Sequence, residues 1–354
     1  MILEKKFHPD YFAITYLVED NSDGLRLDQY LSSYNPSFSR EEIKRRIKDG
    51  HVIILDRPGK HKPTTKLRVG DKLVLTLHKT THEDEYWNGE KLELDTTPKT
   101  IFEDEDLIVI SKPPYMATHP TGKHLFNCAT VFFENIHGKT IHSIHRLDRE
   151  TSGILLLGKS PKTAQTLTPL FEEGLVQKAY FFMAKIHKDY NGDDFFSSEK
   201  RLGTESTGKD RVYIFAYDKE DNRGKSAKTE FKILYKNETY VLGLAFPKTG
   251  RQHQIRVHAK DNGLPLVGDK LYLGSYQMFQ RFKDLWASPE DHTEMELPRH
   301  ALHAVGIYFD YKNEKRLFRA ELPHDFIPWI KEKFSLEAEE IEKTIEYELQ
   351  NYFK

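Results

Sequence analysis

The chain has 354 residues, of which 38% are hydrophobic and 31% are charged, and its formal net charge is −2. This length predicts two domains and at least one sizeable core, and the high charged fraction predicts linkers or solvated arms. The single cysteine, Cys128, excludes an internal disulfide framework and a cysteine-rich zinc site, and it favours a cytoplasmic location. No apolar run is long enough for a transmembrane helix, and the first residues lack the pattern of a secretory signal.

Charge is distributed unevenly along the chain. Residues 40–72 carry 11 Lys or Arg against 5 Asp or Glu, whereas residues 335–354 carry 6 Glu against 2 Lys. A basic segment within an otherwise neutral chain indicates an anionic polymer such as nucleic acid as a partner. Charge alone permits a second interpretation, in which the basic segment is simply a solvated surface.

Residues 23–78 form the first predicted domain, and residues 1–22 are assigned to an N-terminal extension. The spacing of apolar residues predicts two short helices, followed by strands at residues 52–56 and 72–77. Ser39, with an acidic residue three positions later, forms a capping box that predicts the start of the second helix.

The second helix has an apolar face and a basic face. Ile43 and Ile47 are four residues apart and point inward, so the outer surface carries Arg40, Lys44, Arg45 and Lys48. The domain resembles the small RNA-binding domain shared by a small-subunit ribosomal protein and many RNA-modifying enzymes, through Arg26-Leu27-Asp28, Ser39-Arg40, and residues 47–52 and 69–71. The resemblance implies an α/β fold in which Arg26 and the four basic side chains contact RNA. The residues alone also permit a helical hairpin with a solvated basic face.

An acidic linker is predicted at residues 79–98, and the larger domain at residues 99–330. Residues 107–110 read as a buried strand, and further segments read as strands (180–186, 211–217, 229–236, 240–247) or helices (163–175, 253–263). The irregular alternation predicts an α+β domain with a mixed, mostly antiparallel central sheet. The tail, residues 331–354, reads as an acidic amphipathic helix that either packs on the domain or frays.

The stretch HRLDRETSGILLL places the Asp148 carboxylate between two arginines, ahead of a tight turn and an apolar run. An apolar run of this kind predicts a strand buried on both faces, with Asp148 near the rim of the sheet. The local residues favour a carboxylate that caps the turn at Thr151 or Ser152. A reactive carboxylate is the alternative.

Three segments, in order, resemble the RluA-type pseudouridine synthases. The first is HRLDRETSGILLL, whose aspartate is the nucleophile of that family, and the second is Gln177-Lys178-Ala179-Tyr180, which matches its Lys-x-Tyr segment. The third runs from Lys248 to His258 (KTGRQHQIRVH) and contains the arginine that pairs with the aspartate. The resemblance spans residues 101–308 and favours the reactive reading of Asp148.

The resemblance implies an isomerase that detaches uracil from its ribose and rejoins it through carbon 5, without cofactor or metal. Asp148 is then the nucleophile, acting through either a covalent sugar adduct or a glycal. Arg256 keeps Asp148 ionised through a bidentate pair, and Tyr180 lies against the base and takes the proton from carbon 5. The histidines have no ligand spacing that predicts a metal site.

The resemblance also implies that a uridine is turned out of its stack into the site, with Arg146 filling the gap. The remaining residues predicted to contact RNA are His145, Arg251, His253 and Gln254. The predicted partner is structured RNA, with large-subunit ribosomal RNA favoured over transfer RNA, and the predicted state is a monomer. A catalytically silent RNA-binding factor is the second hypothesis, and a glycosidase, which needs a second acid, is the third.

Overall fold

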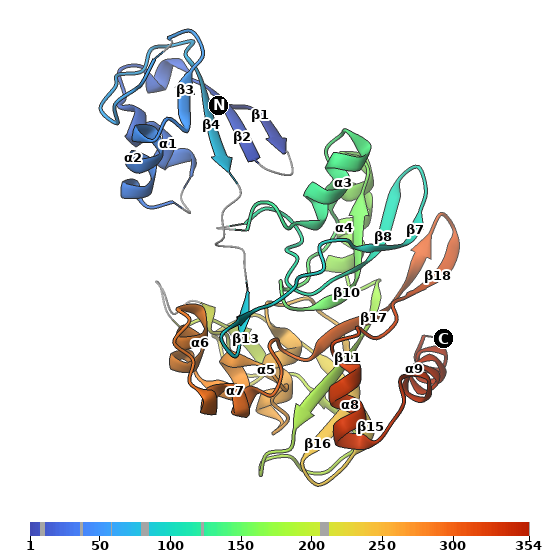
Figure 1. The fold of residues 1–354 in the computed structure, drawn as a ribbon. Coiled ribbons are helices and arrows are strands. Elements are labelled where there is room, and N and C mark those ends of the chain that lie inside the picture. Colours follow the sequence, from blue (N-terminus) through green and yellow to red (C-terminus); the bar gives the residue numbers. More distant parts are fainter. Residues whose placement is uncertain are drawn as a thin grey trace. The chain divides into compact units, whose positions relative to one another are not determined.

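The computed structural model describes residues 1–7, 11–35, 38–57, 59–78, 85–121, 124–205 and 212–353. The chain divides into two compact units, coloured by sequence in Figure 1. The small unit comprises residues 1–84 and 119–140, and the large unit comprises residues 85–118 and 141–354. The two units are described separately below.

The small unit contains a four-stranded antiparallel sheet with the strand order β1-β2-β4-β3. Its strands are β1 (Ile2–Phe7), β2 (Tyr11–Leu17), β3 (Val52–Ile54) and β4 (Lys72–His78). Its helices are η1 (Asp20–Ser22), α1 (Leu27–Tyr34), α2 (Arg40–Lys48) and α3 (Ala129–His137).

The predicted start of the small domain at residue 23 is wrong, because residues 1–22 contribute two strands to its sheet. β2 pairs with β4 along its whole length, from Tyr11 opposite His78 to Leu17 opposite Lys72. Alternate residues of β2 and the residue after it enter the core, namely Phe12, Ile14, Tyr16 and Val18. This period-two alternation is the signal that predicts a half-buried strand.

The predicted start of α2 is confirmed. Ser39 Oγ accepts a hydrogen bond from the Glu42 backbone N–H at 3.2 Å, and Glu42 Oε2 accepts one from the Ser39 N–H at 2.9 Å. Ile43 and Ile47 are buried against the sheet, as their spacing predicts. The basic residues between them therefore lie toward the outer face of the helix.

The large unit is built on a ten-stranded sheet, and the predicted α+β class with a mixed, mostly antiparallel sheet is confirmed. The strand order is β12-β15-β16-β11-β17-β10-β8-β7, with β18 on β17 and β9 on β10. Of the pairings between described strands in this sheet, only β10 with β17 is parallel. The strands are β7 (Lys99–Glu103), β8 (Leu107–Lys112), β9 (His142–Ser143), β10 (Ser152–Gly158), β11 (Gln177–Lys185), β12 (Phe195–Ser198), β15 (Thr229–Lys236), β16 (Tyr240–Pro247), β17 (Leu302–Tyr311) and β18 (Glu314–Arg319).

Helices and two short hairpins complete the large unit. The helices are α4 (Pro161–Glu172), α5 (Gln254–Asp261), the π-helix η4 (Lys270–Gly274), α6 (Tyr276–Lys283), α7 (Pro289–Met295), α8 (Ile327–Phe334) and α9 (Ala338–Tyr352). The hairpins are β5 (Tyr86–Trp87) with β6 (Glu90–Lys91), and β13 (Arg201–Gly203) with β14 (Phe215–Tyr217). The strand predicted at residues 211–217 is therefore limited to β14, and residue 211 lies outside the described residues. No helix among the described residues has the length and apolarity needed to cross a membrane.

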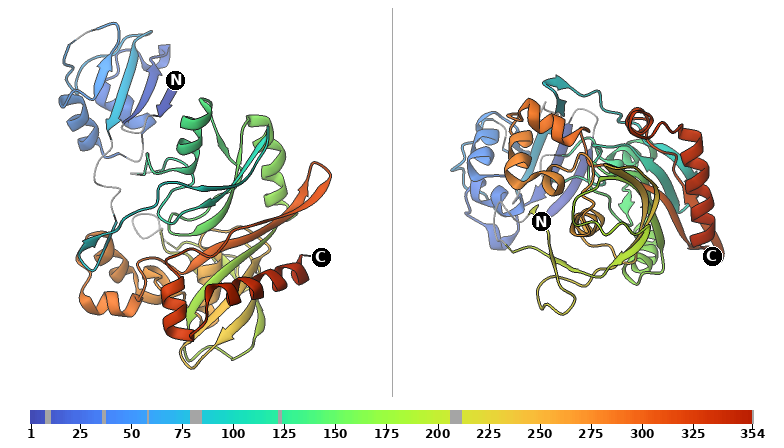
Figure 2. Two further views of the ribbon diagram at one scale, coloured as in Figure 1. Left: turned by 45° about the vertical axis from the view of Figure 1, so that its right-hand side comes forward. Right: turned by 90° about the horizontal axis from the view of Figure 1, so that it is seen from below.

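Two boundaries predicted for the larger domain are also wrong. Within the predicted linker, Trp87 of β5 stacks on Phe282 of α6, with 5.8 Å between ring centroids, so this segment belongs to the large unit. The predicted tail packs rather than frays, since α9 buries Ile341, Ile345 and Leu349 in the same core as α8. Figure 2 shows α8 and α9 beside the sheet.

Strand β11 shows how the sheet separates core from site. Ala179, Phe181 and Met183 face the core that contains α8 and α9. The intervening residues, among them Tyr180 and Phe182, face the other side, where α5 packs. Because side chains alternate along a strand, this register sends Tyr180 toward the α5 side of the sheet.

Strand β10 is buried at every position, as the apolar run predicts, and it sets the place of Asp148. Gly153 pairs with Ala304 in the parallel contact with β17 and has a φ of +104°. A Cβ atom at this position would overlap the Ala304 carbonyl. Only glycine allows this approach, which fixes the loop ahead of β10 at the edge of the sheet.

Candidate active site

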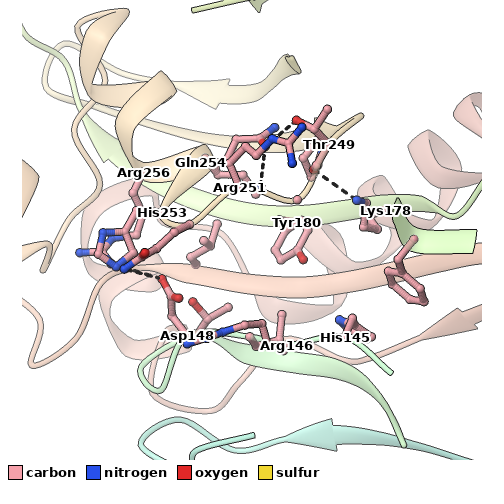
Figure 3. Close-up of a pocket in the computed structure, with 18 of the residues that line it drawn as sticks. His145, Arg146, Asp148, Lys178, Tyr180, Thr249, Arg251, His253, Gln254 and Arg256 are labelled. Atoms are coloured by element: carbon pink, nitrogen blue, oxygen red, sulfur yellow. Dashed lines mark hydrogen bonds and ion pairs between the residues drawn. The ribbon is translucent and has the colours of Figure 1, made fainter. Parts of the chain in front are cut away.

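A cavity of about 560 Å³ in the large unit brings the three predicted motifs together. Its walls come from the loop before β10, from α4, from β11 and from residues 247–256, which lead into α5. Figure 3 shows Asp148, Tyr180 and Arg256 in this cavity, together with seven other labelled residues. Segments more than a hundred residues apart in sequence therefore form one site.

The loop that carries Asp148 is fixed mainly by its backbone and by its neighbours. The Asp148 carbonyl accepts a hydrogen bond from the Thr151 N–H at 3.1 Å. Thr151 Oγ1 lies 2.7 Å from His300 Nε2, and Ser152 Oγ lies 2.8 Å from His303 Nδ1. The turn is thus held without the Asp148 side chain, which faces the cavity, so the capping role favoured by the local residues is wrong.

The pairing of Asp148 with Arg256 is present, but it is not the bidentate pair that was predicted. Arg256 Nη1 donates one hydrogen bond to Asp148 Oδ2 at 3.3 Å. The bidentate contact goes to Asp269, with Nε donating at 2.6 Å and Nη2 at 2.8 Å. Asp269 is fully buried and also accepts from the N–H groups of Leu271 and Tyr272, at 3.1 Å each. Asp269 therefore fixes the guanidinium, and the third nitrogen reaches Asp148.

Asp148 is held as a carboxylate. Burial alone would raise its pKa, but His253, Arg256, His300 and Arg146 outweigh that effect and lower the pKa to about 2. Arg256 is the permanent cation of this group, since the charge of a guanidinium persists across the working range of pH. The side chain retains 26% exposure, so an ionised oxygen is open to the cavity.

His253 faces the same carboxylate, and its hydrogen bonds identify its tautomer. Nδ1 lies 2.9 Å from the Tyr272 hydroxyl, which also accepts the Ile214 N–H at 3.0 Å. Among the described residues this hydroxyl has no second acceptor for its proton, so it donates to Nδ1, and Nε2 carries the ring hydrogen. Burial, with Arg256, lowers the pKa of His253 to about 4, so the ring is neutral near pH 7. The Nε2–H then faces Asp148 Oδ2 across 3.8 Å.

The backbone of His253 supports a functional position for this ring. His253 has φ +53° and ψ +18°, a left-handed conformation at the start of α5. Such a conformation costs a residue other than glycine roughly 1–3 kcal/mol and persists where surrounding contacts enforce it. Here the contacts with Tyr272 and Asp148 provide that enforcement.

Tyr180 lies on β11 across the cavity from Asp148 and is half-buried. Burial, together with the charge of Asp148, raises the pKa of its hydroxyl, so the side chain is a neutral phenol near pH 7. Its ring gives the cavity a flat apolar wall on the side opposite the carboxylate (Figure 3).

The other residues predicted to contact RNA divide into two groups in the large unit. Arg146 is exposed and Arg251 is exposed, and both line the cavity. Gln254 spends its amide inside the protein, accepting from Thr249 and Arg251 and donating to Lys228 and Thr229, which contradicts a role in RNA contact. His145 accepts the Leu156 N–H at 3.1 Å and stacks on Phe171, and burial, with Lys178, lowers its pKa to about 3. It is therefore a neutral structural residue on the cavity wall.

The small unit also uses part of its predicted basic surface for ion pairs. Arg26 and Arg40 both approach Asp28, and Lys44 pairs with Glu41 at 2.6 Å. Arg45 and Lys48 are exposed and have no ion pair among the described residues. These two residues are the ones that remain open to a polyanion.

Sequence reasoning missed Asp269, Tyr272 and Lys178 as parts of the site. The stretch GLPLVGDKLY contains the first two and was noted only as a further segment resembling the family. A buried aspartate that caps η4 and binds Arg256 leaves no periodic or charge pattern in the sequence. Its role follows from the tertiary contact.

Comparisons with known proteins agree with the site. Residues 106–261 match the family model for RNA pseudouridylate synthase. The chain is 31% identical to ribosomal large subunit pseudouridine synthase C of Buchnera aphidicola subsp. Schizaphis graminum, over 90% of this chain and 96% of that protein. It is 33% identical to the mitochondrial tRNA pseudouridine(32) synthase of Saccharomyces cerevisiae, over 76% of this chain and 54% of that protein.

A solved structure shows the same fold. Human RNA pseudouridylate synthase domain containing 4 aligns with a TM-score of 0.52 and 21% identity, covering 66% of this chain and 91% of that one. The fold and the relatives lead to one family. The chain belongs to the RluA-type pseudouridine synthases, isomerases that act on uridines in RNA.

Proposed function

We propose that this enzyme isomerises uridines in structured RNA with Asp148 as the nucleophile, and that large-subunit ribosomal RNA is its target. The observation that carries the assignment is the Asp148 carboxylate, ionised and 26% exposed in a cavity that has a phenol on its opposite wall. Arg256 and His253 both direct hydrogen-bond donors at this carboxylate.

The chemistry requires little beyond this geometry. The bond from ribose C1′ to uracil N1 breaks as the carboxylate attacks C1′ or assists glycal formation. The uracil turns, its carbon 5 bonds to C1′, the proton leaves carbon 5, and N1 gains a proton. A carboxylate that is already ionised and fixed by Arg256 avoids the cost of reorganising at the moment of attack.

Tyr180 is proposed to lie against the uracil face and to relay the proton from carbon 5. Because its raised pKa keeps it a phenol, it takes up the new proton only as its own moves to a neighbouring acceptor. The proton count of the enzyme is then unchanged over the cycle. Arg146, exposed at the cavity rim, is proposed to occupy the space that the uridine leaves in the RNA.

The target RNA rests on the relatives rather than on the cavity. The relative that matches along 90% of this chain is named for the large ribosomal subunit, which favours ribosomal RNA. Transfer RNA is the second candidate, favoured by the 33% identity to the mitochondrial tRNA enzyme. A silent RNA-binding factor fits less well, because it has no need for an ionised carboxylate opposite a phenol.

Mapping pseudouridines in cells tests both parts of the proposal. Cells lacking the gene should lose specific pseudouridines in large-subunit ribosomal RNA, and the wild-type gene should restore them. A gene carrying Asp148→Asn should not restore them, although the protein accumulates to the same level. Loss confined to transfer RNA would reassign the target, and restoration by Asp148→Asn would remove Asp148 as the nucleophile.

A further inference from the structure

Two cations on the cavity wall have no acidic partner among the described residues. Lys178 is only 6% exposed, and its Nζ donates to the Thr249 carbonyl at 3.2 Å. Arg251 is exposed, and its Nε donates to the Ser226 carbonyl at 3.0 Å. By contrast, the buried guanidiniums of Arg256 and Arg299 each face a carboxylate, of Asp269 and Asp325 respectively.

A second buried lysine shows what a structurally satisfied ammonium looks like in this protein. Lys112 is fully buried, and its Nζ donates to the carbonyls of Pro113, Met116 and Arg149 at 3.0, 2.8 and 3.2 Å. All three of its hydrogens are used, and it does not line the cavity. Lys178 lines the cavity and uses one of its three hydrogens within the described part of the chain.

Lys178 is also held in an environment that disfavours its charge. Burial, with the nearby positive charge of Arg251, lowers the pKa of Lys178 to about 8. A buried cation of this kind is stabilised when a ligand supplies the missing negative charge. On β11, Lys178 is two residues before Tyr180, about 6.8 Å along the strand and on the same face.

We propose that Lys178 and Arg251 form a phosphate-binding subsite that holds the RNA backbone phosphate beside the target uridine. This inference rests on the function proposed above, because the residue that faces the base sets which phosphate is near. The two cations serve as a fork: Lys178 presents free ammonium hydrogens from inside the cavity, and Arg251 presents its guanidinium from the rim. The phosphate then fixes the sugar that Asp148 attacks.

The test uses the full chain carrying Asp148→Asn, to prevent turnover, and a fluorescein-labelled synthetic RNA hairpin with uridines in its loop. Lys178→Met removes the charge while keeping an unbranched side chain, and Lys178→Arg restores the charge. Lys248→Met is the matched control, since that neighbouring lysine already pairs with Glu230 at 3.1 Å. The same hairpin is prepared with a neutral methylphosphonate at each loop linkage in turn.

Lys178→Met should weaken binding roughly 10–100-fold, the range for a lost hydrogen bond to a charged group. It should also reduce the slope of log affinity against log salt by about 0.7, the value for one contact to a single strand. Lys178→Arg should recover most of the affinity, and Lys248→Met should leave it within about twofold. One methylphosphonate should weaken wild-type binding by the same factor as Lys178→Met, and should have no added effect in that variant.

Independent, additive losses from Lys178→Met and every methylphosphonate would overturn the subsite. So would unchanged affinity together with a fall in the rate at saturating RNA, measured with Asp148 restored by tritium release from [5-³H]uridine. That second result would place the pair opposite charge on the uracil. A wild-type enzyme that releases no tritium from any RNA would instead refute the proposed function, while the coupling between Lys178 and one phosphate is read from binding alone.

Discussion

The tripeptide Arg-Leu-Asp occurs twice in this protein, at residues 26–28 and 146–148, with opposite outcomes. In the small unit, Arg26 donates to Asp28 through Nε at 2.9 Å and through Nη2 at 2.8 Å, and Asp28 is fully buried. In the large unit, Arg146 is exposed at the cavity, and Asp148 receives its hydrogen bond from Arg256 instead.

The difference lies in what remains open on each carboxylate. Asp28 also accepts the Gln29 N–H at 3.0 Å, so three of its roughly four acceptor positions are filled. Asp148 accepts one hydrogen bond at 3.3 Å and keeps an exposed oxygen. The first carboxylate stabilises a helix start, and the second is available for attack. The same three residues thus give a structural group or a reactive group according to the partners that the fold supplies.

The largest expected effect comes from exchanging each carboxylate for its amide. Asp148→Asn should reduce pseudouridine formation by roughly 10⁴-fold or more, because the nucleophile is lost. Asp28→Asn should lower the free energy of unfolding by about 3 kcal/mol, because it leaves a buried ion pair broken. Tritium release and urea titration measure the two effects. The contrast between the two motifs fails if Asp28→Asn lowers the rate at saturating RNA as much as Asp148→Asn does.

A second prediction concerns Asp269, which fixes Arg256. Asp269→Asn should lower the rate at saturating RNA roughly 10²-fold through misplacement of the guanidinium, with RNA affinity nearly unchanged. Asp291→Asn is the matched control, since Asp291 forms a comparable pair with Arg281 on α6, away from the cavity. Equal losses in both variants would mean that the effect reflects general destabilisation and not the position of Arg256.

The tautomer of His253 gives a third prediction of smaller size. Tyr272→Phe removes the donor to Nδ1, and it should lower the rate roughly tenfold and allow the other tautomer to form. Nitrogen-15 NMR of histidine-labelled protein, with His253→Gln for assignment, should show Nε2 protonated and Nδ1 bare in the wild type. The opposite pattern in the wild type would show that Tyr272 does not set the ring.

The pH dependence follows from the lowered pKa values. Asp148, with a pKa of about 2, is ionised above roughly pH 3, and His253, with a pKa of about 4, is neutral above roughly pH 5. The rate at saturating RNA should therefore be flat from pH 5 to pH 7.5. Arg256→Gln should raise the pKa of Asp148 and create a fall in rate on the acid side. A wild-type rate that falls tenfold between pH 7 and pH 5 would contradict an ionised Asp148.

The smallest expected effect concerns the small unit. Charge reversal at Arg45 and Lys48, which are exposed without a described ion pair, should weaken RNA binding and reduce its salt slope by about 0.9 per contact to duplex RNA phosphates. The rate at saturating RNA should be unchanged. If reversal leaves affinity and salt slope as they are, this surface does not lie on the RNA.

Much of the site can be predicted from the sequence, because its reacting groups sit in short motifs. The stretch around Asp148, the segment with Tyr180 and the segment with Arg256 each have a spacing that resembles the family, and the buried strand after Asp148 follows from its apolar run. The capping box at Ser39 was likewise readable, since its hydrogen bonds join residues three apart.

Other features were decided by contacts between distant segments. The strands at residues 2–17 belong to the small unit because β2 pairs with β4 some sixty residues later, although their alternation was readable. The acidic tail became part of the core because Ile341, Ile345 and Leu349 meet β11 and β17, which nothing in the tail itself indicates.

The sequence by itself therefore determined which carboxylate, which phenol and which guanidinium this protein brings to its chemistry. Only the tertiary structure decided how each is held: that Asp269 takes the bidentate contact of Arg256, that Tyr272 sets the hydrogen of His253, and that Lys178 has no acidic partner among the described residues. The physical reason is that side-chain chemistry is local to a residue. Ionisation, tautomer and free hydrogen-bonding capacity depend on neighbours that the fold brings from elsewhere.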